Sequence, residues 1–549
     1  MIAMNKRCLL FIGLLMIGCF AKAQSFGEFV INPNPNGYGS FPSGFTVLNN
    51  KLYFSAYDDS NGFEPWVTDG NSGQLLADIF PGTGNSFPQK FMVDSNLLFF
   101  QADDYTHGAE LWVTDGDSTQ MVKDIYSGQN PSLPQNLFVF NHKLFFQADD
   151  GVHGPELWIS DGTSAGTQLF ADINQTQGDT AGSFPSGFTI YNGKMYFNAD
   201  DGVHGYELWC TDGTSNGTNL VKDIWQGVYS STPTGFTVFS SKLYFSATDS
   251  VNGTELWCTD GTANGTQLVM DINPGYQSSA PQGFTVYNSQ LIFQADDGVH
   301  GPELWSTTGN TGVTQLVSDI YQGATGAYPS GFTVYQGKLF FQATDSIHGT
   351  ELWRTDGTNN GTVLFKDINT GGSSSNPAYF IIYHSNLYFI AAPDSVTGAE
   401  MFVTDGTSGG TQVIIPGGTP LTNPLVATNG FTLFNDGLAF NAYYDIAYGE
   451  QLWLYNDGPS GIVKVNAQQA FTLFPNPCKD YYTLSGFKPG ETYNIALSDI
   501  MGRVLQSQQL QASDKDIRFL APPVSPGMYL LQVQSGQELT TLQLIKGDR

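Results

Sequence analysis

Glu255-Leu256-Trp257-Cys258-Thr259-Asp260-Gly261-Thr262 is the clearest copy of a string that recurs along most of the chain. Its Glu-Leu-Trp core returns nine times, with small variations, at Glu64, Glu110, Glu156, Glu207, Glu255, Glu303, Glu351, Glu400 and Glu450. The mean period is about 48 residues, which is typical of repeat arrays and β-propellers.

One repeat is long enough for four short strands. In the copy that begins at Ser330, residues 331–335 and 338–343 are rich in β-branched and aromatic residues and are separated by a two-residue turn. Residues 351–355 and 362–368 predict a third and a fourth strand. Turns this short force antiparallel pairing, so each repeat predicts a four-stranded antiparallel sheet.

The second strand of each repeat is apolar on both faces, as in Leu339-Phe340-Phe341. A sheet with one wet face would alternate, so these sheets must be covered on both sides. Radial stacking does this, and we expect an all-β fold with a β-propeller of about nine blades. Eight blades or two smaller assemblies also fit. Residues 26–32 and 461–466 both resemble a fourth strand, which leaves open which end closes the ring.

These strings resemble the ELWxxDGT repeat family of secreted bacterial proteins, sometimes labelled hyalin-like. The resemblance covers about residues 26 to 466. It implies a repeat scaffold at or outside the cell surface and does not imply a known reaction.

The N-terminus predicts a signal peptide over residues 1–23. Lys6 and Arg7 precede an apolar run, and Ala21-Lys22-Ala23 is a small-x-small cleavage site, so the mature chain should start at Gln24. An alternative makes Cys19 a lipoprotein cysteine, although the residues before it fit that signal poorly. No other long apolar segment occurs, so we expect no transmembrane segment after cleavage.

The repeat pattern ends near residue 469. Short strands between Pro and Gly turns then predict a small β-sandwich over residues 469–549. The propeller is therefore predicted to span residues 24–468. Three blocks in this region resemble the type A sorting domain of the type IX secretion system. The matching residues are Pro475, Asn476, Pro477, Gly502, Arg503, Gly527, Tyr529 and Lys546. The resemblance implies handling by that secretion machinery and removal of the domain on export. The alternative is an accessory sandwich that binds a ligand.

The chain carries a formal net charge of −29. A surface this acidic repels phosphate backbones, so nucleic acid is excluded as a partner.

The loop between the second and third strands repeats acidic residues and histidine. Asp149, Asp150, Asp200, Asp201, Asp296 and Asp297 form adjacent pairs in three repeats. Paired carboxylates beside backbone carbonyls suit Ca²⁺, but the spacing lacks the alternating pattern of known calcium loops. The alternative is a capped turn with a surface histidine.

Histidines and aromatic residues are predicted to share the face that carries these loops. The histidines are His107, His153, His204, His300 and His348, and the aromatic residues after the fourth strands are Phe80, Tyr126, Trp225 and Tyr321. Exposed rings beside acidic and hydroxyl groups suit sugar stacking, whereas the alternative is packing between blades.

The sequence contains no HExxH, phosphate-loop or CxxC motif. Our favoured hypothesis is therefore a secreted or cell-surface, non-enzymatic propeller that binds a glycan or a protein. The alternatives are a polysaccharide-acting enzyme with carboxylates near the central channel, or a structural component of a surface layer or matrix.

Overall fold

The computed structural model describes residues 25–31, 34, 39–176, 181–309, 313–396, 398–414, 430–445, 449–456, 472–474, 481–499, 504–520, 527–535 and 538–546. Apart from a 3-10 turn, η1 (Ser215–Gly217), the regular elements in these residues are all β-strands. Contacts divide the chain into two compact units, Met1–Ser460 and Gly461–Arg549. The expected domain boundary at residues 468/469 lies outside the described residues.

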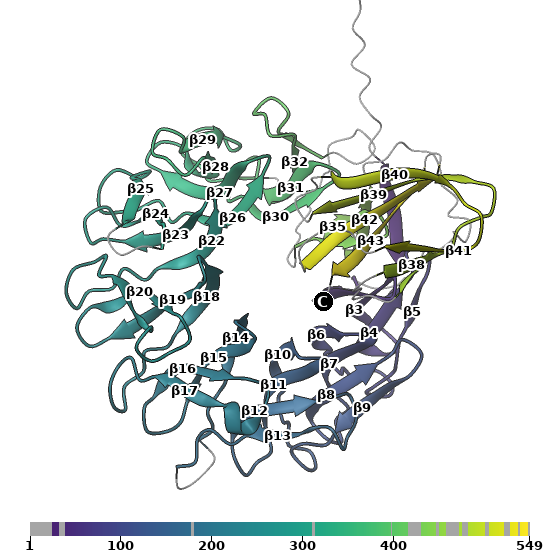
Figure 1. Cartoon of the computed structure of the whole chain (residues 1–549), viewed down its shortest axis with the longest axis horizontal. Coiled ribbons are helices and arrows are strands. Elements are labelled where there is room, and N and C mark those ends of the chain that lie inside the picture. The colour runs from purple at the N-terminus through teal and green to yellow at the C-terminus, as the bar shows by residue number, and fades with distance from the viewer. Residues whose placement is uncertain are drawn as a thin grey trace, which may run out of the picture. The chain divides into compact units, whose positions relative to one another are not determined.

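The described residues of the first unit form nine four-stranded antiparallel sheets, which are the blades of a propeller (Figure 1). The first strands are β2 (Ser43–Leu48), β6 (Gln89–Asp94), β10 (Gln135–Phe140), β14 (Ser186–Tyr191), β18 (Thr234–Phe239), β22 (Gln282–Tyr287), β26 (Ser330–Tyr335), β30 (Ala378–Tyr383) and β34 (Thr432–Phe434). The second strands are β3 (Lys51–Asp58), β7 (Leu97–Asp103), β11 (Lys143–Asp149), β15 (Lys194–Asp200), β19 (Lys242–Asp249), β23 (Gln290–Asp296), β27 (Lys338–Asp345), β31 (Asn386–Ala391) and β35 (Gly437–Asp445).

The outer half of each blade completes the meander. The third strands are β4 (Gly62–Thr68), β8 (Ala109–Thr114), β12 (Pro155–Ser160), β16 (Tyr206–Thr211), β20 (Gly253–Thr259), β24 (Pro302–Thr307), β28 (Gly349–Thr355), β32 (Glu400–Thr404) and β36 (Gly449–Asn456). The fourth strands are β5 (Gly73–Leu75), β9 (Thr119–Lys123), β13 (Gln168–Ala171), β17 (Asn219–Lys222), β21 (Gln267–Met270), β25 (Thr314–Ser318), β29 (Val363–Lys366), β33 (Gln412–Val413) and β1 (Ser25–Ile31). The first strands lie on the inner side of the ring (Figure 1).

Apolar side chains fill the space between neighbouring blades, as the two-sided second strands predict. Phe146 and Trp158 of the third blade pack with Phe99 of the second in one buried cluster. A matching cluster joins Trp66 of the first blade to Phe434 of the ninth. The stack of blades therefore closes into a complete ring, with edges left only at the inner and outer strands.

The N-terminal strand closes this ring. Strand β1 pairs antiparallel with β36, with Phe26 opposite Tyr455, and so supplies the fourth strand of the ninth blade. The competing segment 461–466 lies outside the described residues. The register also corrects the ninth repeat: Gln451 lies opposite Ala442 where Glu64 lies opposite Ala56, so Gln451, and not Glu450, occupies the motif position.

The second unit is built from two sheets around one core. One sheet has the order β37 (Thr472–Phe474), β38 (Tyr481–Ser485), β41 (Asp516–Leu520). The other has the order β40 (Val504–Gln511), β39 (Thr492–Asp499), β42 (Gly527–Ser535), β43 (Glu538–Lys546). Leu484 of the first sheet and Leu531 and Leu544 of the second share a buried cluster, which confirms a small β-sandwich.

Removing the closing strand should open the ring. A variant that lacks residues 25–31 should show a clear fall in melting temperature and a tendency to associate, because β36 becomes an unpaired edge beside a buried core. Thermal unfolding and size-exclusion chromatography measure both effects. A variant that lacks residues 1–24 alone is the control, and equal melting temperatures for the two variants would contradict this account of closure.

Candidate functional site

The loops between second and third strands and the loops between blades lie together on one face of the ring, which we call the loop face. A methyl group added at Gly108 would lie 2.8 Å from the backbone nitrogen of Pro131, and one added at Gly253 would lie 2.4 Å from the backbone oxygen of Gln277. In both cases a second-to-third strand loop packs on the loop that leads to the next blade. The opposite face, which we call the turn face, carries the remaining tight turns.

A buried carboxylate organises the loop face. The Glu255 side chain is fully buried and accepts hydrogen bonds from Ile272 N at 2.9 Å, from Ser279 N at 2.9 Å and from Ser279 Oγ at 2.6 Å. Burial raises the pKa of Glu255 to about 7, and the hydrogen bonds from Ser279 and Ile272 oppose this shift. The carboxylate therefore fixes the end of its own blade and the start of the next loop.

The same serine joins the next blade. Ser279 O accepts a hydrogen bond from Asp296 N at 2.9 Å, which connects the fifth blade to the sixth. Serine partners of this kind serve Glu64, Glu110, Glu156, Glu207 and Glu351 as well. At the ring closure Gln451 accepts from Ser40 Oγ at 2.5 Å, and Ser40 O accepts from Tyr57 N at 2.7 Å. We call this arrangement the glutamate staple.

The carboxylates that the sequence suggested for calcium accept hydrogen bonds within their own turns. Asp297 accepts from His300 N at 2.8 Å and pairs with His300 Nδ1 at 2.7 Å, while Asp296 accepts from Gly298 N at 2.7 Å. Equivalent pairs join His107 to Asp104, His153 to Asp150, His204 to Asp201 and His348 to Asp345. Within the described ranges, no group of three or more His, Cys, Asp or Glu side chains is arranged to hold a metal ion. Calcium binding stays a prediction.

Local bonding also shifts the ionisation of these pairs. The hydrogen bond to Asp297 raises the pKa of His300 above its ordinary value. Partial burial of Asp297 raises its pKa. The hydrogen bonds from His300 outweigh this effect, so the pKa of Asp297 lies below its ordinary value. Asn61 makes the same contact to Asp58, at 2.7 Å, so an amide can replace the imidazole in this turn.

The predicted aromatic residues lie on the loop face, where they contact neighbouring loops. Phe80 stacks on Tyr105 of the next blade, with ring centroids 5.0 Å apart, and Trp225 stacks on Tyr229 at 5.4 Å. A methyl group at Gly151 would lie 2.4 Å from the Tyr126 ring. Tyr321 packs against the cluster between the sixth and seventh blades. The structure brings these rings to the same face as the histidines but half-buries each one.

A set of residues that sequence reasoning missed lies just before the first strands. Each follows the serine or alanine of the staple, precedes a proline and adopts a positive φ between 45° and 51°. We call them the rim residues: Phe41, Phe87, Leu133, Phe184, Thr232, Ala280, Tyr328 and Asn376. Because the first strands are innermost, these residues surround the mouth of the channel. The repeated Ser-x-Pro pattern was available in the sequence as a signal.

Exposed apolar side chains gather on the loop face. Fifteen of the large hydrophobic side chains that are exposed in the first unit lie there: Phe41, Phe87, Tyr105, Leu133, Val152, Phe184, Val203, Val228, Tyr229, Val251, Tyr276, Val299, Tyr328, Ile347 and Val396. Eight more lie on the first strands or at their starts, and two lie near the fourth strands, at Val313 and Val363. A concentration of exposed apolar side chains on one face favours interaction with a partner.

The loop face is also acidic. Its described loops contain thirteen aspartates and neither lysine nor arginine, and seven more aspartates end the second strands that lead into them. Basic side chains lie elsewhere: Lys143 and Lys338 pair with Asp161 and Asp356 at 3.2 and 3.4 Å on the turn face. The loop face therefore combines apolar side chains with an excess of negative charge.

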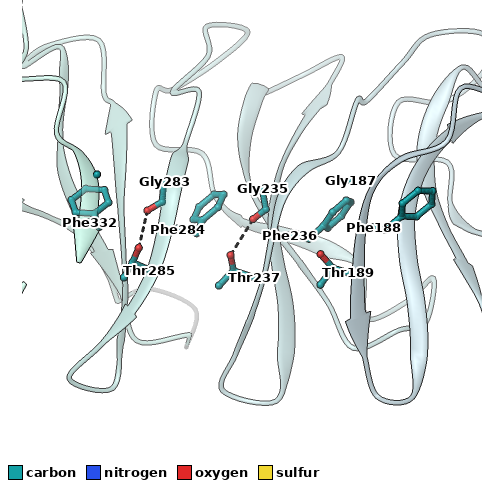
Figure 2. A pocket seen from close by; sticks show the side chains of 11 residues that line it. Gly187, Phe188, Thr189, Gly235, Phe236, Thr237, Gly283, Phe284, Thr285 and Phe332 are labelled. Atoms are coloured by element: carbon teal, nitrogen blue, oxygen red, sulfur yellow. Dashed lines mark hydrogen bonds between the residues drawn. The ribbon is translucent and has the colours of Figure 1, made fainter. Parts of the chain in front are cut away.

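The channel wall has a different chemistry. A cavity of about 480 Å³ lies against β14, β18, β22 and β26, where each strand presents Gly-Phe-Thr. Figure 2 shows the phenyl rings in a row and the Thr237 and Thr285 hydroxyls bonded to the carbonyls of Gly235 and Gly283, at 3.2 and 3.3 Å. A methyl group at Gly235 would lie 2.9 Å from the Phe284 ring of the next blade. The wall is therefore uncharged and partly aromatic.

This cavity is limited to four blades by a change of residue. The glycines of these strands have a φ near 70°, and the equivalent positions in the flanking third and eighth blades are Asn136 and Tyr379, also with positive φ. In the remaining blades the position is Gly44, Lys90 or Gly430. Among the nine first strands as described, Lys90 and Asp94 are the charged residues.

A second hollow lies on the turn face of the eighth, ninth and first blades, with a volume of about 490 Å³. The His384 ring stacks on Tyr383 at 3.9 Å, and His384 Nε2 lies 2.8 Å from Asp436 Oδ1. Val47 and Leu433 provide an apolar part of the lining. A mixed lining of this kind suits a small polar ligand.

Of the sorting-domain residues, Gly527, Tyr529 and Lys546 are described. Gly527 lies opposite Lys546 in the hairpin of β42 and β43, and Tyr529 lies opposite Leu544. The remaining motif residues, Pro475, Asn476, Pro477, Gly502 and Arg503, lie outside the described residues, as do Ala21, Ala23 and Gln24. No helix among the described residues has the length and apolar character that a membrane span requires.

Residues 472–547 match the family of secretion system C-terminal sorting domains. This match indicates that the chain is exported through a secretion system. No curated protein matches the chain.

Several solved structures are similar at low identity. PorZ, an essential bacterial surface component of the type-IX secretion system of Porphyromonas gingivalis, is 10% identical over 92% of this chain and 75% of its own, with a TM-score of 0.35. A prolyl endopeptidase is 10% identical over 75% of this chain and 56% of its own, with a TM-score of 0.39. The β-propeller domain of the Trilobed protease from Pyrococcus furiosus is 10% identical over 70% of this chain and 100% of its own, with a TM-score of 0.33.

The glutamate staple should dominate stability. Glu255→Ala should lower the free energy of unfolding by about 3–5 kcal/mol, because it leaves several buried donors unsatisfied. Ser279→Ala should cost only about 1 kcal/mol, because the chain already has Ala327 at the equivalent position beside Glu303. Urea denaturation at neutral pH compares the two variants. A larger loss for Ser279→Ala than for Glu255→Ala would contradict this ranking.

The same measurement should depend on pH. The pKa of Glu255 is about 7 in the folded chain, whereas its ordinary value, which we take for the unfolded chain, is 4.5. Between pH 4.5 and 7 the folded state therefore binds more protons than the unfolded state. The contribution of Glu255 to the free energy of unfolding should therefore be complete below about pH 4.5. It should be lost as the pH rises through 7. A flat stability profile across this window would show that the carboxylate remains ionised throughout.

Proposed function

We propose that this chain is an exported, cell-surface propeller whose loop face binds another protein without catalysing a reaction. The observation that supports this most strongly is the concentration of exposed apolar side chains on that face. Protein interfaces combine apolar and polar residues, and the loop face has both apolar side chains and aspartates.

A protein fits this face better than a glycan. Several exposed tips are aliphatic, including Val203, Val299 and Ile347, and aliphatic chains do not stack on sugar rings. Glycan recognition also needs convergent polar groups, whereas the aspartates and histidines of the second-to-third strand loops already bond within their own turns.

A binding role also fits the channel better than hydrolysis does. A polysaccharide-acting enzyme would need an acid and a base close together near the channel. The described first strands contribute Lys90 and Asp94 as their charged residues, and the cavity wall in the fourth to seventh blades is uncharged. These observations favour binding.

Photo-crosslinking on intact cells tests the proposed face. A photoreactive residue placed at Val203 or Ile347 should give defined adducts to a partner, because these side chains are exposed on the loop face. The same residue at Ser241 or Ser289, exposed on the turn face, should give few. Equal adducts from both faces, or adducts from the turn face alone, would contradict the proposal.

The export route that we propose is the type IX system, with cleavage at both ends of the chain. The family match over residues 472–547 supports the sorting step. Strand β1 begins at Ser25, directly after the expected cleavage site, and β36 ends at Asn456. Because β1 supplies the fourth strand of the ninth blade, removal of the tail takes no described strand from the ring.

Mature extracellular protein should therefore start at Gln24 and lack most of residues 470–549. Intact-mass measurement on secreted material checks both ends in one experiment. A full-length tail on exported protein would contradict processing by the sorting route, and lipid on Cys19 would contradict the expected signal-peptide cleavage.

A further inference from the structure

We infer that the rim residues are binding residues for a basic polypeptide segment that carries large apolar side chains. The inference rests on the proposed function, because it names the partner's chemistry and the contact residues on the loop face.

The backbone of the rim does not require large side chains. All eight rim residues adopt nearly the same φ although they range from alanine to phenylalanine. Hydrogen bonds of the backbone hold the loop: Phe184 N donates to Pro155 O at 2.9 Å, and Tyr328 N donates to Pro302 O at 2.9 Å. This left-handed conformation costs an L-residue other than glycine or asparagine roughly 1–2 kcal/mol.

Large apolar residues nevertheless occupy most of these strained positions. Phe41, Phe87, Leu133, Phe184 and Tyr328 are 43%, 56%, 45%, 39% and 54% exposed. Phe87 packs on Phe63 with ring centroids 5.6 Å apart, yet more than half of its surface stays in water. Packing within the chain thus accounts for only part of each side chain. Strained residues that persist under such conditions indicate a functional site.

The electrostatics of the face select the partner. The loop face has thirteen aspartates in its described loops and seven more at the ends of the second strands that lead into them, so it attracts a basic chain and repels an acidic one. Five of the eight rim side chains are large, apolar and exposed at the channel mouth, so the partner must also offer apolar side chains there. A basic segment with large apolar residues meets both conditions.

Two synthetic amphipathic peptides test this inference on the mature exported protein. They share one pattern of leucines and differ in their polar residues, which are all lysine in one and all glutamate in the other. Fluorescence anisotropy at physiological ionic strength should show binding of the lysine peptide and at least tenfold weaker binding of the glutamate peptide. Absence of lysine-peptide binding, or equal binding of both peptides, would overturn the inference.

The rim variant replaces Phe87, Phe184 and Tyr328 with asparagine, which the chain itself uses at Asn376 with a φ of 48°. We expect at least a tenfold loss of affinity for the lysine peptide, with an unchanged or higher melting temperature because asparagine tolerates this backbone. Val313→Asn combined with Val363→Asn is the matched control, since both residues are exposed apolar residues away from the loop face. This control should bind like the wild type.

A third variant separates the inference from the proposed function. It changes Val203, Val299 and Ile347, at the outer loop tips, to serine. If the tip variant loses affinity and the rim variant does not, the rim inference is overturned and the loop face remains the binding face. If neither variant changes affinity, attraction to the aspartates of the loop face alone explains binding, and the rim inference is overturned. A rim variant that unfolds at a lower temperature would assign these side chains to stability instead.

Discussion

The propeller depends on a carboxylate that is buried where a charge is costly. Burial of an ionisable group is tolerated only when hydrogen bonds satisfy it. Glu255 meets this condition by accepting from two backbone N–H groups and a hydroxyl that belong to the segment leaving its blade. Because Ser279 O is in turn bonded to the next blade, one side chain fixes the angle between neighbours. Hydrophobic packing stabilises the stack, and the staple determines its geometry.

That constraint also determines where side chains can vary. The staple holds the Ser-x-Pro backbone at the channel mouth, and the variable residue of that loop points to solvent whatever its identity. The inner strands behave in the same way: a positive φ recurs at Gly187, Asn136 and Lys90, but the side chain changes. The cavity in the fourth to seventh blades therefore lies where the first strands have glycine at this position, while the backbone conformation is the same as in the neighbouring blades.

The sequence predicts the repeat period, the four-stranded blades and the stacking of neighbouring blades. It does so because the same pattern of apolar residues recurs in every repeat. It does not predict ring closure, since two terminal segments had the same pattern and pairing depends on contacts between distant residues. Gln451 was hidden for a related reason: the adjacent Glu450 matched the motif, and only the register against Ala442 separates them. The repeated aspartates and histidines of the second-to-third strand loops were visible in the sequence. The sequence did not show that these aspartates accept hydrogen bonds within their own turns, as Asp297 does from His300 N.

Repetition therefore carries two kinds of information in this chain. Positions that repeat in both backbone and side chain, such as Glu255 and Ser279, have the same bonds in almost every blade and are explained by the scaffold. Positions that repeat in backbone alone, such as the rim, keep a strained conformation while the side chain changes from Phe184 to Ala280. A scaffold needs only the backbone there, so the choice of side chain is free to respond to a partner. For this reason a nearly ninefold structure can present an unequal surface, with large apolar residues on the first four blades and smaller ones on the next two.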